Sequence, residues 1–222
     1  MKFRRRSESA SEEPILIDVE VETVDVVDDD EQAEEAHEPR DARLAAGPYD
    51  LEEDFAEEAR IDLGSLLLPQ RDGLNLQMQL DQASGEVMAC LLTAEEGGVE
   101  LRAFAAPRAG DLWSETLPQL AADASQRGGV TAVREGRWGT ELLCQFPVTM
   151  PDGEEGVQAS RIAGINGPRW LLRATFLGAP GIDQNAGDVW DDLVAGIVVR
   201  RGDSPLPVGE ALPLVMPATG EA

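Results

Sequence analysis

The sequence predicts an α+β fold: a mainly antiparallel sheet, strongly curved or split into a sandwich, with two helices packed on it. Two observations lead to this fold class. Short segments with alternating apolar and polar residues recur through the middle of the chain and are linked by glycine-containing turns, which is typical of antiparallel strands. Two longer segments instead repeat their apolar residues at helical spacing, and they interrupt the strands rather than alternating with them.

Negative charge is concentrated at the N-terminus. The chain has 222 residues and a formal net charge of -25, and its first 60 residues hold 21 acidic against 7 basic side chains. We predict a disordered acidic arm over residues 1–58, a single α+β domain over 59–203 and an extended Pro-rich tail over 204–222. Such a charge repels nucleic acids and anionic membranes. No run approaches the roughly 18 apolar residues of a membrane helix, so we expect a soluble, cytoplasmic protein.

One stretch of the arm has two interpretations. In "PILIDVEVETVDVV", Ile15, Ile17, Val19 and Val21 alternate with mostly acidic residues, which is the periodicity of a strand. The favoured interpretation is a disordered acidic-hydrophobic tract, because like charges on one face oppose pairing. The other is a strand that forms against a partner's sheet edge or against this protein's own. Both interpretations stay open at the level of sequence.

The first strands of the domain form a meander. "LEEDFAEEAR", residues 51–60, predicts one or two helical turns that lead into "IDLGSLLLP" at 61–69. "LNLQMQL", residues 74–80, alternates most clearly, with three leucines and a methionine on one face. "EVMACLLTA" at 86–94 and "VELRAFAA" at 99–106 follow after short turns. Links this short predict antiparallel neighbours.

Two helices and further strands complete the domain. Asp111 predicts the N-cap of a helix that runs to about Arg127, where a Gly-Gly pair ends it. Pro118 lies inside this pattern, so it is expected to kink the helix or to mark a start one turn later. "DQNAGDVWDDLVAG", residues 183–196, predicts the second helix. The remaining strand candidates are "VTAVRE", "TELLCQFPV", "VQASRIAGI", "RWLLRATF" and a short closing strand, "IVVR".

Several of these segments resemble a known family. "RIDLGSLLLP", "VELRAFAAPRAGDLW", "QRGG" and "GINGPRWLLRATFLG", in this order, are similar to the DUF3710 proteins of actinobacteria over about residues 47–215. That family is functionally uncharacterised, so the resemblance implies no catalytic residues. It implies a bacterial cytoplasmic protein with a variable acidic N-terminal extension. The order of strands and helices also resembles the Mog1/PsbP-like sandwich, an analogy that concerns fold alone.

The sequence lacks the residues that most kinds of catalytic site need. His37 is the only histidine and lies in the arm, which excludes a Ser-His-Asp triad, a Cys-His pair and a multi-His metal site. Cys90 and Cys144 lie in apolar stretches without metal or redox spacing, so we expect both to serve packing. No glycine-rich phosphate motif follows a strand. We therefore predict no catalytic residue, metal or cofactor.

Carboxylates are abundant enough to leave one enzymatic alternative. A two-acid hydrolase would combine Asp62 with Asp188, Asp191 or Asp192. Solvated acids in an acidic protein explain these residues better, because a shifted carboxyl pKa needs a cleft. An enzyme is therefore not the primary prediction.

The segment "INGPRWLLRATFLG" at 165–178 holds the candidate partner-binding residues. Strand alternation places Arg169 and Arg173 on one face and the apolar Trp170 and Phe176 on the other. Arg161, on the preceding strand candidate, could join them. One interpretation is that these arginines pair with the protein's own acids on a solvated face. The other is a cationic strip for an acidic tail, a nucleotide or a partner's carboxylates.

The sequence therefore predicts a non-catalytic binding or adaptor domain with a protein partner, and without nucleic acid or membrane binding. The alternative is a small-molecule-binding protein or a carboxylate-based hydrolytic enzyme. A ligand-sized cleft lined by Arg161, Arg169 or Arg173 together with paired acids would favour the alternative. A filled sandwich with only a flat exposed patch would favour the adaptor.

Overall fold

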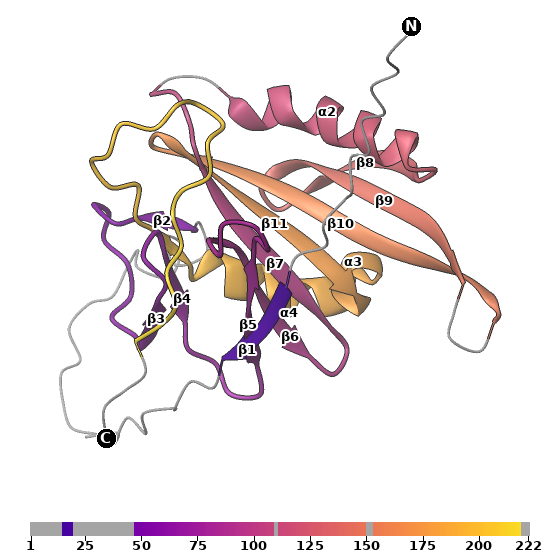
Figure 1. The fold of residues 1–222 in the computed structure, drawn as a ribbon, viewed down its shortest axis with the longest axis horizontal. Coiled ribbons are helices and arrows are strands. Elements are labelled where there is room, and N and C mark those ends of the chain that lie inside the picture. The colour runs from indigo at the N-terminus through magenta and orange to yellow at the C-terminus, as the bar shows by residue number, and fades with distance from the viewer. Residues whose placement is uncertain (1–14, 20–46, 109–110, 150–152, 219–222) are drawn as a thin grey trace, which may run out of the picture.

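The computed structural model describes residues 15–19, 47–108, 111–149 and 153–218 (Figure 1). The larger of two sheets has eight strands, in the spatial order β1 (Ile15–Val19), β5 (Asn75–Leu80), β6 (Val87–Ala94), β7 (Gly97–Ala105), β11 (Trp170–Gly178), β10 (Glu155–Gly167), β9 (Gly139–Thr149) and β8 (Val130–Gly136). The smaller has four, in the order β2 (Tyr49–Asp50), β12 (Val198–Val199), β4 (Leu66–Pro69) and β3 (Arg60–Asp62). The helices of the described residues are α2 (Leu112–Gln126), α3 (Ala179–Ile182) and α4 (Gln184–Ala195).

This architecture confirms the predicted α+β class. Within the described residues every strand pair is antiparallel except β2 with β12. Figure 1 shows α2 on one side of the larger sheet and the α3–α4 pair on the other. No helix in the described ranges is long and apolar enough to cross a membrane.

The main hydrophobic core lies between one face of the larger sheet and the smaller sheet with α4. Trp170 and Phe176 of β11, Leu68 of β4 and Trp190 and Leu193 of α4 belong to this single cluster of buried side chains. Since side chains alternate along a strand, β11 turns its residues of even number toward this core. The predicted facing of Trp170 and Phe176 is confirmed.

The opposite face of the sheet is partly covered by α2. Trp113 packs with Leu171 in a second buried cluster, so this side of β11 is not a purely solvated surface. A Cβ atom on Gly164 of β10 would lie only 2.0 Å from the Trp113 ring, so the absence of a side chain there lets the helix approach. The Trp113 indole donates a hydrogen bond to the Thr140 carbonyl at 2.7 Å, which ties α2 to β9.

Helix α2 begins at the predicted cap. The Asp111 carboxylate accepts hydrogen bonds from the Ser114 amide at 3.0 Å and from Asn166 Nδ2 at 2.6 Å. The Ser114 hydroxyl also donates to this carboxylate, and it is the main cause that holds the pKa of Asp111 below its ordinary value. Pro118 lies inside the helix. The alternative of a start one turn later is therefore wrong.

The N-terminal boundary of the fold differs from the one predicted. Residues 47–58, which the prediction placed in the arm, are described, and Tyr49–Asp50 pair with β12 in the smaller sheet. Residues 51–59 form a turn and an irregular segment instead of the predicted helical turns. Residues 15–19 pair with β5, with Ile17 opposite Met78, so the strand lies against this protein's own sheet edge. The rest of the predicted arm, including His37, lies outside the described residues.

The C-terminal segment after β12 lies along the domain. Leu212 and Leu214 are buried in the main core. The Leu212 amide donates to the Ala103 carbonyl at 2.8 Å, and Phe104 forms a bridge with Ala211. This segment therefore continues the β-structure where β6 and β7 stop pairing.

Trp170 links the two sheets through a polar contact inside the core. Its side chain is 1% exposed, and its indole nitrogen donates to the buried Asp50 carboxylate of β2 at 2.7 Å. A Cβ on Gly167 would lie 2.1 Å from the Trp170 ring, so the ring occupies the space above the β10–β11 turn. In that turn Arg169 has a φ of 63°, a left-handed conformation that is uncommon for a residue with a side chain.

Trp170→Ala is expected to lower the free energy of unfolding by about 3–5 kcal/mol, the range for large aromatics in cores. Trp170→Phe keeps most of the packing but leaves Asp50 Oδ2 without its donor, while Oδ1 still accepts from the Glu52 amide, at a cost of about 1–3 kcal/mol. Arg169→Ala should cost under about 1 kcal/mol, as for a partly exposed ion. Urea denaturation of the three variants measures these losses. Equal losses at positions 169 and 170 would contradict the assignment of Trp170 to the core and of Arg169 to a partly exposed turn.

Candidate functional site

A charged cleft of about 480 Å³ opens between the β8–β9 hairpin and α4. Every residue that lines it is charged or glycine: Arg134, Glu135, Gly136, Arg137, Glu141, Arg161, Gly187, Asp188, Asp191 and Asp192. Five carboxylates therefore face three guanidinium groups. A ligand that fills this cleft meets charge and hydrogen-bonding groups on all sides and no apolar side chain.

Arg161 forms the floor of the cleft and is almost fully buried, with 1% of its surface exposed. It donates from Nη1 to Glu141 Oε1 at 2.9 Å and from Nη2 to Asp191 Oδ1 at 2.6 Å. Its Nε reaches the Pro180 carbonyl at 3.4 Å, and its guanidinium stacks 3.7 Å from the centre of the Phe176 ring. Acceptors thus surround the planar group in the geometry that arginine prefers.

Glycines on both walls make room for this network. A Cβ atom on Gly136 would lie 2.1 Å from the carboxyl carbon of Glu141, so a larger residue would displace that carboxylate. A Cβ on Gly187 of α4 would lie 3.3 Å from Arg161 Nη2. Glu141 is 1% exposed and also accepts from Arg134 Nε at 3.1 Å, so it joins two arginines.

The rim of the cleft is more exposed. Arg137 pairs with Asp192 at 2.6 Å, and the Asp192 side chain is 76% exposed. Glu135 accepts from the Thr140 hydroxyl at 2.9 Å. Among the described residues neither Glu135 nor Asp188 has an arginine partner. These two carboxylates carry the surplus negative charge of the site.

The three arginines predicted as a strip do not lie together. Arg161 is the cross-strand partner of Phe176, so it faces the core side and the cleft. Arg173 lies on the opposite face of β11, with Nη2 3.7 Å from Glu100 Oε1 on β7. Arg169 lies in the turn before β11 rather than in the strand.

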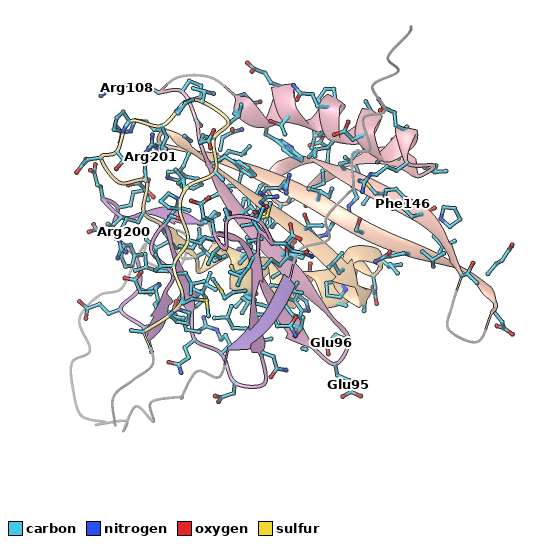
Figure 2. The ribbon with its side chains drawn as sticks, in the orientation of Figure 1. Glu95, Glu96, Arg108, Phe146, Arg200 and Arg201 are labelled. Carbon is cyan, nitrogen blue, oxygen red and sulfur yellow. The ribbon has the colours of Figure 1, made fainter. Side chains whose placement is uncertain are left out.

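Arg169 contacts the start of the C-terminal segment, at Arg201 and Gly202. Its Nη2 donates to the Gly202 carbonyl at 3.3 Å, while its own carbonyl accepts from Arg201 Nε at 3.1 Å. Figure 2 shows Arg200 and Arg201 close together beside the yellow C-terminal segment. Arg169 does not line the cleft.

The predicted carboxylate pair is also separated. Asp62 lies on β3 and does not line the cleft. Its carboxylate takes two hydrogen bonds from Arg200, each of 3.0 Å, which lower the pKa of Asp62. Asp188, Asp191 and Asp192 do line the cleft. In the described residues no three His, Cys, Asp or Glu side chains form a group that could hold a metal ion.

Both cysteines serve packing, as predicted. Cys90 lies in the main core, and its burial raises the pKa of its thiol to about 12. Cys144 is buried with Leu142 and Ala124 beneath α2, and burial raises its pKa as well. Both are free thiols and neither lines the cleft.

Arg161→Met should lower the free energy of unfolding by about 3–5 kcal/mol, because it leaves the Glu141 and Asp191 carboxylates buried without their partner. Arg134→Met is the matched control. Arg134 is one-third exposed and Glu141 keeps Arg161, so its loss should stay near or below about 1 kcal/mol. Adding Glu141→Gln and Asp191→Asn to Arg161→Met should restore part of the loss. Equal midpoints of urea denaturation for the two single variants would contradict this account.

Comparison with known proteins identifies the family of the chain. Residues 47–222 match the family model described as "Protein of unknown function (DUF3710)". Neither the curated proteins nor the solved structures give a match, so the Mog1/PsbP-like analogy stays a prediction. The matched range begins at Gly47, where the described range 47–108 also begins, and it covers well over half of the sequence. The chain therefore belongs to the DUF3710 family.

Proposed function

We propose that this protein is a non-catalytic binding domain and that the cleft around Arg161 takes a cationic amine or guanidinium group. The observation that carries the proposal is the lining of the cleft, in which every side chain is charged and carboxylates outnumber guanidinium groups by five to three. A ligand-sized cleft lined by Arg161 and paired acids is the feature expected of the alternative, a small-molecule-binding protein or a carboxylate-based enzyme, rather than of an adaptor with a flat docking patch. We therefore take the small-molecule or side-chain binding part of that alternative, without its catalysis. The ligand can be a small polyamine or a basic side chain of a partner protein, which share this chemistry.

The charge of the cleft selects for a cation. Arg161 holds Glu141 and Asp191 by ion pairs of 2.9 and 2.6 Å, so these two carboxylates are fixed before any ligand enters. Glu135 and Asp188, without arginine partners in the described part of the chain, are the groups left to bind an ammonium. The formal net charge of -25 draws cations toward the protein at long range.

The same geometry favours binding over hydrolysis. A two-carboxylate hydrolase needs one carboxyl group that donates a proton and another that acts as base or nucleophile. Environments that push the two carboxyl pKa values apart produce this division. Here the Arg161 guanidinium binds both Glu141 and Asp191, and Glu141 also accepts from Arg134, so both carboxylates are already engaged as acceptors. The cytoplasmic location and the lack of nucleic acid binding stay predictions from the charge pattern.

Titration calorimetry of the full chain with spermidine and with a trilysine peptide tests the proposal. The double variant Asp188→Asn, Glu135→Gln should bind the preferred probe at least about tenfold more weakly, which corresponds to about 1.4 kcal/mol. Asp123→Asn, at an exposed position of α2, is the control for general attraction to an acidic protein. A stronger response to spermidine indicates a small ligand, and a stronger response to trilysine indicates a protein partner.

Two results would overturn the proposal. One is equal affinity of the double variant and the Asp123→Asn control for both probes. The other is a one-to-one complex with ATP, used as an anionic probe, that is lost in the double variant.

A further inference from the structure

We propose a second binding site, on the opposite face of the larger sheet, where Arg102 and Arg173 hold the carboxylate or phosphate group of an anionic ligand. This site is independent of the cleft. Arg173 and Arg161 lie on opposite faces, because Arg161 shares a face with its cross-strand partner Phe176 and Arg173 is three residues from Phe176. The two sites also take ligands of opposite charge.

The two arginines are direct neighbours across β7 and β11. Arg102 and Arg173 are cross-strand partners, which places their Cβ atoms about 4.5–5.5 Å apart. Both guanidinium groups lie against the Phe104 ring, at 5.6 Å for Arg102 and 5.3 Å for Arg173. Like charges in this arrangement destabilise a sheet unless a counter-charge is near.

The counter-charge supplied by the described residues is insufficient. Glu100 lies 3.7 Å from Arg173, but its other oxygen already accepts a hydrogen bond from Gln79 at 3.2 Å. Arg102 has no carboxylate partner among the described residues. The Nε atoms of both arginines are buried and lack an acceptor there. Each guanidinium carries five N–H donors, so two forks of donors share one distant carboxylate.

Other buried arginines of the same domain do have partners. Arg161 pairs with two carboxylates. Arg60, whose side chain is 7% exposed, pairs with Glu58 at 3.0 Å, although its Nε also lacks an acceptor in the described residues. The contrast with Arg102 and Arg173 therefore lies in the close carboxylate and not in the Nε atom. The Arg173 side chain is 16% exposed. Its burial is the main cause that lowers the pKa of Arg173, and the positive charge of Arg102 lowers it further. Within the ranges that the structure describes, Glu100 is the one carboxylate that forms an ion pair with either arginine. The uncompensated charge fits a site whose counter-ion comes from a ligand.

The chemistry of the pair defines the ligand group. Planar guanidinium forks match the paired oxygens of carboxylates and phosphates and bind them with charge-assisted hydrogen bonds. The site is bordered on one side by α2, because the Trp113 ring occupies the space over Gly164, the cross-strand partner of Arg173. The Phe104 ring forms an apolar base under both forks.

Thermal unfolding of the full chain in phosphate and in citrate, each compared with chloride at equal ionic strength, tests this site. Arg127→Gln is the matched control. Arg127 stacks on the ring of Phe146 at 5.1 Å, the same kind of contact, but its side chain is exposed. Phe146 lies on β9 and is labelled in Figure 2. The unchanged chain and Arg127→Gln should gain stability with increasing phosphate or citrate. Arg102→Gln and Arg173→Gln should need at least about tenfold more anion for the same gain.

A second readout guards against a general salt effect. Phosphate raises the stability of many proteins because it is excluded from their surface, and such a gain would be equal in all variants. Equal gains in Arg102→Gln and Arg127→Gln would therefore overturn the proposal.

In chloride, Arg102→Gln should be no less stable than the unchanged chain, since it removes a like-charge contact. If Arg173→Gln does not fold, the anion dependence of thermal unfolding in Arg102→Gln alone tests the site. A response to phosphate but not citrate, or the reverse, supports the site and identifies the group it takes.

Discussion

The buried guanidinium of Arg161 is the contact on which the charged side of this protein depends. It joins β10 to Glu141 of β9 and to Asp191 of α4. The removal of three charges from water costs more than their attraction returns unless every hydrogen-bonding group finds a partner. Here two carboxylates, a carbonyl and the Phe176 ring surround the guanidinium. This contact fixes α4 against the sheet, and α4 leads directly to β12, the strand that pairs with β2 and β4 in the smaller sheet.

The pleat of β11 explains why one strand serves such different environments. Residues of even number, such as Trp170 and Phe176, pack against the smaller sheet and α4. Leu171 points the other way and packs with Trp113 of α2, while Arg173, on the same side, lies against the Phe104 ring. Arg161, whose cleft holds the surplus carboxylates, shares the core face with Phe176, while Arg173 lies on the opposite face. The surplus carboxylates and the pair of arginines therefore cannot neutralise each other.

Local sequence patterns predicted the features that depend on neighbouring residues alone, such as strand facing and helix caps. The alternation in 170–176 gave the core face, and Asp111 gave the cap of α2. The burial of Arg161 could not be predicted, because its partners lie 20 and 30 residues away in the chain. Arg102 was in a predicted strand, but β7 pairs with β11 rather than a sequence neighbour on that side. Tyr49–Asp50 is too short for a periodic signal, and the acidic surroundings of residues 15–19 hid a strand that pairs with β5.

The two proposed sites differ in how salt acts on them. The surplus carboxylates of the cleft rim face solvent, and the net charge of -25 adds long-range attraction for a cation. Raising ionic strength shortens the Debye length from about 10 Å at 0.1 M to about 3 Å at 1 M and weakens that attraction. At the Arg102–Arg173 pair the net charge repels an approaching anion, and hydrogen bonds from the two guanidinium groups would hold the anion once it is bound. Screening therefore removes an obstacle there, so anion binding falls less with added chloride than cation binding in the cleft. Paired titrations of spermidine and citrate at two chloride concentrations measure this difference, and an equal loss at both sites would show that long-range charge does not separate them.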